Sequence, residues 1–243
     1  MTGGSRRLAA TVGVSLVALV TVAATPWVRS VAGRPVPYRH YEATMLGSAQ
    51  YHVAVIGDSY TAGSAEGGEG PNGWTERAWQ TLGQRGVPVT ADVASEGGAG
   101  YVVRGNRGDL FEDLTAQSVQ PDDALVVFFG SRNDQDVDPA EMTRMAHDTL
   151  GLARRVTPSA KMLVIGPPWP TADVPGTVLR IRDILGAEAH LVGAEFVDPI
   201  ADRWFVDRPD LIGADGVHPN DAGHAYLADK IVPLISALLP KQA

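Results

Sequence analysis

Short apolar runs alternate with segments of helical periodicity along most of this chain, and this alternation limits the folds available to it. The run at residues 124–130, ALVVFFG, is apolar at consecutive positions, as in strands buried on both faces of a parallel sheet. Other runs of strand character lie at residues 51–57, 89–95, 161–168 and 194–200. Apolar residues at helical spacing lie between and after these runs, at 74–82, 109–119, 139–156, 177–185 and, near the C-terminus, at Leu227, Ile231, Leu234 and Leu238. The pattern predicts an α/β fold, a three-layer α/β/α sandwich with a central, mostly parallel sheet.

The composition is that of an ordinary globular protein with one core. The 243 residues are 44% hydrophobic and 20% charged, which suffices for one sizeable domain. The formal net charge of -8 argues against a nucleic-acid partner, because such a partner favours a basic surface. The chain has no cysteine, so disulfides, thiolate metal sites and cysteine nucleophiles are excluded.

The N-terminus has the features of an export signal. Arg6 and Arg7 precede an uncharged stretch, residues 8–28, with small residues near its end. We assign residues 1–24 to a signal peptide or N-terminal membrane anchor, 25–49 to a linker and 50–243 to the globular domain. If the segment is retained, residues 8–28 are long enough to span a bilayer and would be the only membrane contact. Both alternatives predict an exported protein, either secreted or associated with the cell envelope.

Polar and Gly-rich segments follow three of the predicted strands. GDSYTAG contains Ser59, SEGGAG contains Gly97 and Gly98, and GSRND contains Asn133. Ligands of open parallel sheets bind beyond the carboxyl ends of the strands, so we expect these segments to meet at one edge of the sheet. The segment DGVHPN, residues 215–220, precedes the last predicted helix and is expected at the same edge.

These side chains have the chemistry of a serine hydrolase. A serine hydroxyl is a weak nucleophile, so Ser59 needs a base, and His218 can accept a proton near neutral pH. Asp215, three residues before His218, can orient the imidazole and stabilise the imidazolium. An oxyanion could be stabilised by the backbone N–H groups of Ser59 and Gly98 and by the side-chain amide of Asn133.

The same segments resemble the four sequence blocks of the SGNH (GDSL-type) hydrolase family, in the family's order. GDSY resembles the first block, SEGGAG the glycine block, GSRND the Gly-x-Asn-Asp block and DGVHPN the last block. The resemblance implies a flavodoxin-like α/β/α fold and a serine esterase or lipase that needs no cofactor or metal. It implies catalytic roles for Ser59, Gly98, Asn133, Asp215 and His218, with Gly97 as the alternative to Gly98. In this chain Tyr60 replaces the family's usual leucine, and a Gly-rich insert, GSAEGGEGPNG, delays the first helix.

Several alternatives stay open at this point. The same residues could transfer the acyl group to a sugar hydroxyl, which would make the protein an O-acyltransferase. The fold could also serve as a catalytically idle carbohydrate-binding protein, although Ser59 and His218 are both present. A metal site formed by Asp215, His218, Asp221 and His224 lacks a recognisable spacing signature. A small-molecule, lipid or cell-envelope glycan ester would fit as substrate, and a monomer is the default expectation.

Overall fold

The computed structural model describes Met1 and residues 38–42 and 50–240, and the described strands form one sheet. Its strands follow the order β1-β3-β2-β4-β5-β6. Their bounds are β1 Tyr38–Tyr41, β2 Tyr51–Gly57, β3 Val89–Ser95, β4 Leu125–Phe129, β5 Lys161–Ile165 and β6 Glu195–Val197. Strands β2 to β6 are mutually parallel, and β1 pairs with β3 in antiparallel orientation. The predicted mostly parallel sheet is confirmed.

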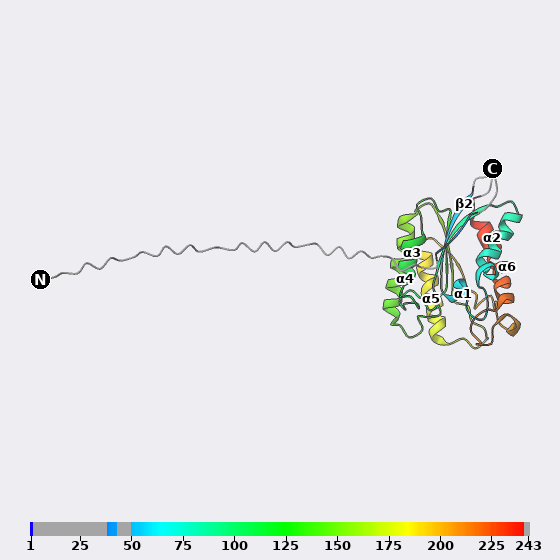
Figure 1. Ribbon diagram of the computed structural model, residues 1–243. Helices are drawn as coiled ribbons and strands as arrows, with labels where there is room; N and C mark the ends of the chain where they lie inside the picture. The colour runs from blue at the N-terminus through cyan, green and yellow to red at the C-terminus, as the bar shows by residue number, and fades with distance from the viewer. Residues whose placement is uncertain (2–37, 43–49, 241–243) are drawn as a thin grey trace. The chain divides into compact units, whose positions relative to one another are not determined.

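Helices cover both faces of this sheet (Figure 1). One face carries α2 (Trp74–Gln84) and α6 (Asp221–Leu238). The other carries α3 (Phe111–Ser118), α4 (Pro139–Val156) and α5 (Gly176–Leu191). Three short helical segments lie in loops: α1 (Ser59–Ala62), η1 (Gly70–Asn72) and η2 (Pro209–Leu211). The three-layer α/β/α sandwich expected from the sequence is therefore present.

The central strands contribute alternate side chains to two separate cores. In β4, Leu125, Val127 and Phe129 pack in the cluster beneath α2 and α6. Val126 and Phe128 face the opposite way, into the cluster beneath α3, α4 and α5. All five side chains are fully buried, which explains why the run is apolar at consecutive positions.

The strand order changes direction between β2 and β4. Counted from β2 along the chain, the five parallel strands have the order 2-1-3-4-5, which is the flavodoxin-like arrangement. In this arrangement ligands bind beyond the carboxyl ends of the strands on either side of the reversal. Ser59 follows β2 and Asn133 follows β4, so both lie at this point.

The structure differs from the sequence analysis at the start of the domain. Residues 25–49 were interpreted as a linker, but Tyr38–Tyr41 forms strand β1 at the edge of the sheet. A run of four residues that includes Arg39 and His40 is too short and too polar to show a strand pattern in the sequence. The predicted signal or anchor, residues 1–24, lies outside the described residues except for Met1, as does the rest of the 8–28 stretch.

The C-terminal helix was predicted in the right place, with a small difference in its buried face. Leu227 and Ile231 are buried as expected, and the face continues through Ile235, whereas Leu234 and Leu238 are only partly buried. The helix passes through Pro233 without ending. Within residues 38–42 and 50–240, no helix is both long and apolar enough to cross a bilayer.

Candidate active site

Ser59 is the first residue of α1, directly beyond the carboxyl end of β2. The preceding Asp58 caps this short helix, because its Oδ1 accepts a hydrogen bond from the Tyr60 N–H at 2.9 Å. Gly57 is required by the tight turn from strand to helix, since a Cβ at that position would lie 2.2 Å from Thr61 Oγ1. The Gly-Asp-Ser sequence therefore fixes where the Ser59 hydroxyl emerges from the sheet.

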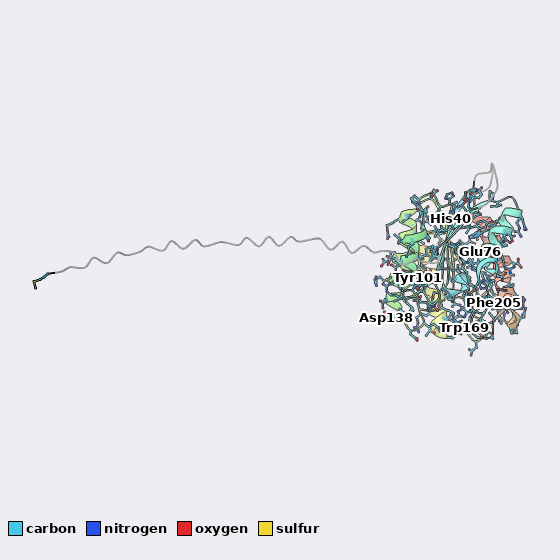
Figure 2. All side chains as sticks on the ribbon, viewed as in Figure 1. His40, Glu76, Tyr101, Asp138, Trp169 and Phe205 are labelled. Atoms are coloured by element: carbon cyan, nitrogen blue, oxygen red, sulfur yellow. The ribbon has the colours of Figure 1, made fainter. Side chains whose placement is uncertain are left out.

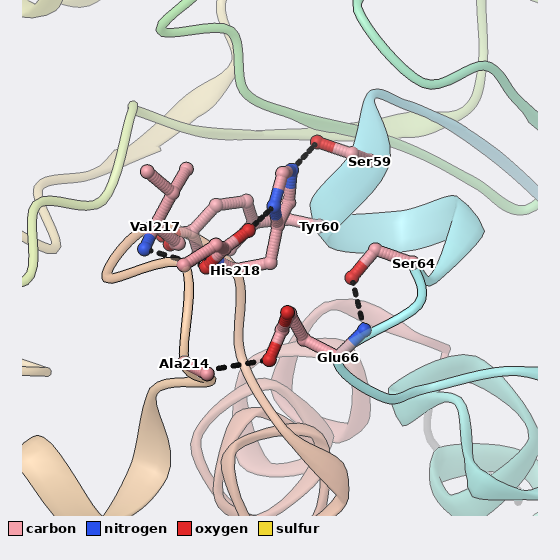
Figure 3. Close-up of polar contacts among 8 residues, drawn as sticks. Ser59, Tyr60, Ser64, Glu66, Ala214, Val217 and His218 are labelled. Atoms are coloured by element: carbon pink, nitrogen blue, oxygen red, sulfur yellow. Dashed lines mark hydrogen bonds and ion pairs between the residues drawn. The ribbon is translucent and has the colours of Figure 1, made fainter.

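His218 reaches Ser59 from the loop before α6 (Figure 3), and Asp215 lies three residues earlier in the same loop. His218 Nε2 lies 3.0 Å from Ser59 Oγ, and His218 Nδ1 lies 2.5 Å from Asp215 Oδ2. The other carboxylate oxygen of Asp215 accepts hydrogen bonds from the backbone N–H groups of Val217, at 2.8 Å, and His218, at 2.9 Å. The structure thus brings three predicted site residues into one hydrogen-bonded chain.

The charge of Asp215 is stabilised by these contacts. Desolvation alone would raise its pKa, but hydrogen bonds from the His218 ring and from the His218 and Val217 backbone lower the pKa to about 2. Asp215 is therefore ionised at any pH at which His218 could act as a base. Side-chain exposures of 27% for His218 and 33% for Asp215 leave the pair open to a substrate.

Gly98 and Asn133 lie in two loops that contact each other. The Ala99 N–H donates to Glu96 O at 3.1 Å, which closes a turn after β3 in which Gly98 has a φ of 79°. This left-handed conformation favours glycine. Asn133 Nδ2 donates to Ala99 O at 2.7 Å and so joins the loop after β4 to this turn. One N–H of the Asn133 amide is used in this bond, and the second is available to another acceptor.

Two buried aspartates support this edge of the sheet. Asp134 accepts the backbone N–H groups of Tyr101, Val102 and Val103 at 2.9 to 3.0 Å and thereby holds the loop that follows the glycine turn. Burial raises its pKa despite these three donors. Burial also raises the pKa of Asp58 to about 7, against the opposing effects of the Tyr60 N–H, His218 and Arg132.

Two residues outside the predicted set hold the loop that carries Asp215 and His218. Tyr60 is buried, and its hydroxyl donates to Val217 O at 2.5 Å. Glu66, from the Gly-rich insert, accepts the backbone N–H of Ala214 at 2.6 Å (Figure 3). The sequence offered one signal for the first of these, because Tyr60 departs from the leucine usual at that position.

His224 does not join the site. It is fully buried in α6 and neither ring nitrogen has a hydrogen-bond partner within the described part of the chain. Asp221, three residues earlier, accepts instead from the Gly68 N–H and from Asn72 Nδ2, both at 2.9 Å. Among residues 38–42 and 50–240, no cluster of three or more His, Asp or Glu side chains is arranged to hold a metal ion.

The sequence that forms this site matches a known protein family. The family model of GDSL-like lipases/acylhydrolases matches residues 55–226, a range that includes all five predicted site residues. The chain is 65% identical over 209 residues to a GDSL lipase of Mycobacterium tuberculosis. This match covers 85% of this chain and 90% of the relative.

Solved structures with low sequence identity share the fold. The lipase/acylhydrolase from Enterococcus faecalis has 19% identity and a TM-score of 0.61, and the match covers 80% of this chain and 100% of that one. Est24, a carbohydrate acetylesterase from Sinorhizobium meliloti, has 19% identity and a TM-score of 0.56, with 78% of this chain and 100% of that one covered. Both similarities concern the fold alone.

Proposed function

Since this chain belongs to the GDSL-like lipase/acylhydrolase family and is an ester-hydrolysing enzyme, we propose that it works through a Ser59-His218-Asp215 triad and an acyl-enzyme. The observation that carries this proposal is the continuous chain of contacts from Asp215 Oδ2 through the imidazole to Ser59 Oγ. In this arrangement Nδ1–H donates to Asp215, which leaves Nε2 free to accept the serine proton.

The reaction then proceeds in two halves. Ser59 Oγ attacks the ester carbonyl as its proton moves to His218 Nε2, and the bond between carbonyl carbon and alcohol oxygen breaks as Nε2 returns that proton to the leaving alkoxide. Water, deprotonated by the same nitrogen, attacks the acyl-serine. The bond between the acyl carbon and Ser59 Oγ then breaks as Nε2 returns the proton to Oγ, which releases the carboxylic acid and regenerates Ser59.

The proposed oxyanion donors are the backbone N–H groups of Ser59 and Gly98 and the second N–H of the Asn133 amide. The hydrogen bond from Asn133 to Ala99 supports this assignment, because it fixes the amide beside the glycine turn. Donors fixed in advance stabilise the developing charge without reorganising during the reaction.

We also propose that the enzyme acts outside the cytoplasm, on an O-acyl ester in the cell envelope or its surroundings. This rests on Arg6, Arg7 and the uncharged stretch at residues 8–28. Fractionation of cells that express a C-terminally tagged full chain tests it. Tagged protein found only in the cytosol would contradict export.

Replacing Ser59 by alanine tests the catalytic proposal. Ser59→Ala should lower kcat on p-nitrophenyl esters by about 10⁴-fold or more, because serine hydrolases lose this much when the nucleophile is removed. It should also abolish labelling by a serine-directed phosphonate. Ser236→Ala, at an exposed position of α6, is the matched control and should keep both properties. A folded Ser59→Ala enzyme with most of its activity would rule out this mechanism.

A further inference from the structure

Arg132 carries a positive charge beside the proposed active site without a counter-ion. It lies between β4 and Asn133, at the carboxyl edge of the sheet. Its side chain lies within hydrogen-bonding reach of Tyr60, but no ion pair is found for its guanidinium within residues 38–42 and 50–240, and one of its nitrogens, Nη1, is shielded from water with no hydrogen-bond partner there. A shielded guanidinium nitrogen without an acceptor is costly, so this arrangement needs an explanation.

Trp169 holds this guanidinium in place. The Arg132 Cζ lies 4.0 Å from the centroid of the Trp169 ring, a cation–π contact. The ring itself is fixed, because Trp169 Nε1 donates to Asp173 O at 3.0 Å. Figure 2 labels Trp169 near the lower end of the sheet. Figure 1, in the same view, labels α1 toward that end as well. The guanidinium is therefore oriented by an aromatic face, and its Nη1 is the donor that has no partner within the described residues.

The positive charge of Arg132 affects the pKa values of Asp58 and Tyr60, the residues on both sides of Ser59. Burial raises the pKa of Tyr60, and the nearby Arg132 opposes the increase. Arg132 likewise favours the ionised form of Asp58. Neither Asp58, which is fully buried, nor Asp134, which accepts from backbone N–H groups, forms an ion pair with Arg132 within the described residues. The positive charge thus lies close to Asp58 and Tyr60, the two residues that flank Ser59 in the chain.

A pocket of about 350 Å³ is lined in part by the three residues that follow Trp169 in the chain. One wall, Pro170 to Ala172, continues the chain from Trp169, and the opposite wall includes Gly216, which lies beside Asp215. Its charged lining residues are Arg208, which is paired with both carboxylate oxygens of Asp210, and Asp207, which is paired with Arg203.

We propose that Arg132, stacked on Trp169, binds a negatively charged group of the substrate, a carboxylate or a phosphate carried near the ester bond. This rests on the proposed function, because it assumes that the ester is bound at Ser59. Guanidinium pairs with carboxylate and phosphate in the same two-pronged geometry, so the arginine fits both groups. The enzyme's preferred substrates are then anionic esters, despite the net charge of -8.

Matched esters measure this preference. The acetyl esters 4-acetoxybenzoate and 4-acetoxyphenyl phosphate carry the anion on the alcohol side, and 4-acetoxybenzamide is their neutral match. The mono-4-nitrophenyl ester of adipic acid carries it on the acyl side, with the 4-nitrophenyl ester of adipamic acid as its match. The full-length enzyme should hydrolyse at least one anionic ester with a kcat/KM about tenfold or more above its neutral match, as expected for a charge-assisted hydrogen-bonded pair. The preference should decrease as NaCl is added.

Arg132→Gln should reduce the ratio of anionic to neutral kcat/KM to about one, through a higher KM for the anionic ester. Trp169→Leu should reduce the same ratio by removing the face that orients the guanidinium. Arg144→Gln, on the exposed side of α4, removes the same charge and should leave the ratio at its wild-type value. Thermal unfolding of each variant shows whether it is folded.

The outcomes separate this inference from the proposed function. No anionic preference in the wild type, or a preference that survives in folded Arg132→Gln, would overturn the anion site while neutral esters are still hydrolysed through Ser59. Preference for the benzoate or adipate indicates a carboxylate, and preference for the phenyl phosphate indicates a phosphate. Hydrolysis of the neutral esters that persists in Ser59→Ala would instead contradict the proposed function.

Discussion

His218 Nε2 lies 3.0 Å from Ser59 Oγ although 159 residues separate the two in the chain. Ser59 is fixed by the end of β2, whereas His218 sits on a loop before α6. The alignment of nucleophile and base therefore depends on what holds that loop.

Replacing Asp215 by asparagine should slow the reaction with little change in shape. The carboxylate is ionised because its pKa is lowered to about 2, and asparagine cannot stabilise an imidazolium or enforce the same tautomer. We expect kcat to fall by about 10³- to 10⁴-fold, as in other serine hydrolases that lose this charge. Phosphonate labelling of Ser59 should slow in parallel. Wild-type labelling of Asp215→Asn would mean that Ser59 is activated by another group.

Replacing Asn133 by alanine should affect kcat more than KM. The amide is proposed to act once charge has developed on the carbonyl oxygen, so its loss should lower kcat by about 10²- to 10³-fold. Because Asn133 also donates to Ala99 O, thermal unfolding is measured in the same variant. A large increase in KM with kcat maintained would assign Asn133 to substrate binding rather than to the oxyanion site.

Removing the Tyr60 hydroxyl should loosen the loop at Val217. Tyr60→Phe keeps the ring contacts with Phe129 and Phe205 but removes the hydrogen bond to Val217 O. We expect kcat to decrease by roughly 2- to 12-fold while the fold is retained, since a net hydrogen bond contributes roughly 0.5–1.5 kcal/mol. Steady-state kinetics with a neutral ester test this. Tyr41→Phe, at the far edge of the sheet, is a matched control.

Glu66 should be required at the other end of the same loop. Its carboxylate accepts the Ala214 N–H, so Glu66→Ala should lower kcat and slow phosphonate labelling. Glu66→Gln retains a carbonyl acceptor and should restore most of both. Equal loss in the alanine and glutamine variants would show that the negative charge, rather than the hydrogen bond, matters. Glu69→Ala, at an exposed position of the same segment, should behave as the wild type.

Because His224 is buried, the free energy of unfolding should decrease in mild acid. Burial is the main reason that its pKa is lowered to about 4; Arg77 and Arg39 add to this effect and Asp221 opposes it. Between pH 6.5 and 4 the unfolded chain binds a proton that the folded protein excludes, so the free energy of unfolding decreases as the pH falls through this range.

The lowered pKa corresponds to a loss of about 3 kcal/mol across that range. Urea unfolding at several pH values compares the wild type with His224→Gln, whose side chain does not titrate. The wild type should lose stability relative to the variant as the pH is lowered, and parallel curves would contradict the prediction. Activity at neutral pH should change little, because His224 does not contact the site.

Local patterns predicted most of the fold because each helix and central strand buries a continuous apolar face. The residues of β4 and the helical spacing of Trp74, Ala78 and Leu82 indicate burial without knowledge of their partners. Strand β1 could not be predicted in this way, since its pairing depends on β3 about fifty residues later along the chain.

The residues of the candidate site were likewise predictable where they occur in a local motif and unpredictable where they act through a long-range contact. Ser59, Asp215 and His218 were identified because their residue types occur in motifs that carry the chemistry. Tyr60 and Glu66 were not, because what matters is a single hydrogen bond to backbone atoms 157 and 148 residues away. Such contacts leave no periodicity or motif in the sequence. The stacking of Arg132 on Trp169 was equally hidden, since the sequence does not show which arginines contact an aromatic ring.

The antiparallel edge strand β1 has a practical consequence for any shortened form of this protein. A protein that began at residue 50, the start of the domain as predicted from sequence, would leave one side of the seven-residue strand β3 without its hydrogen-bonding partner. Unpaired edges of this length readily join other chains, so such a protein should aggregate or form mixed oligomers. A recombinant form that starts before Tyr38 retains the edge strand, and cleavage near residue 24 during export would retain it too.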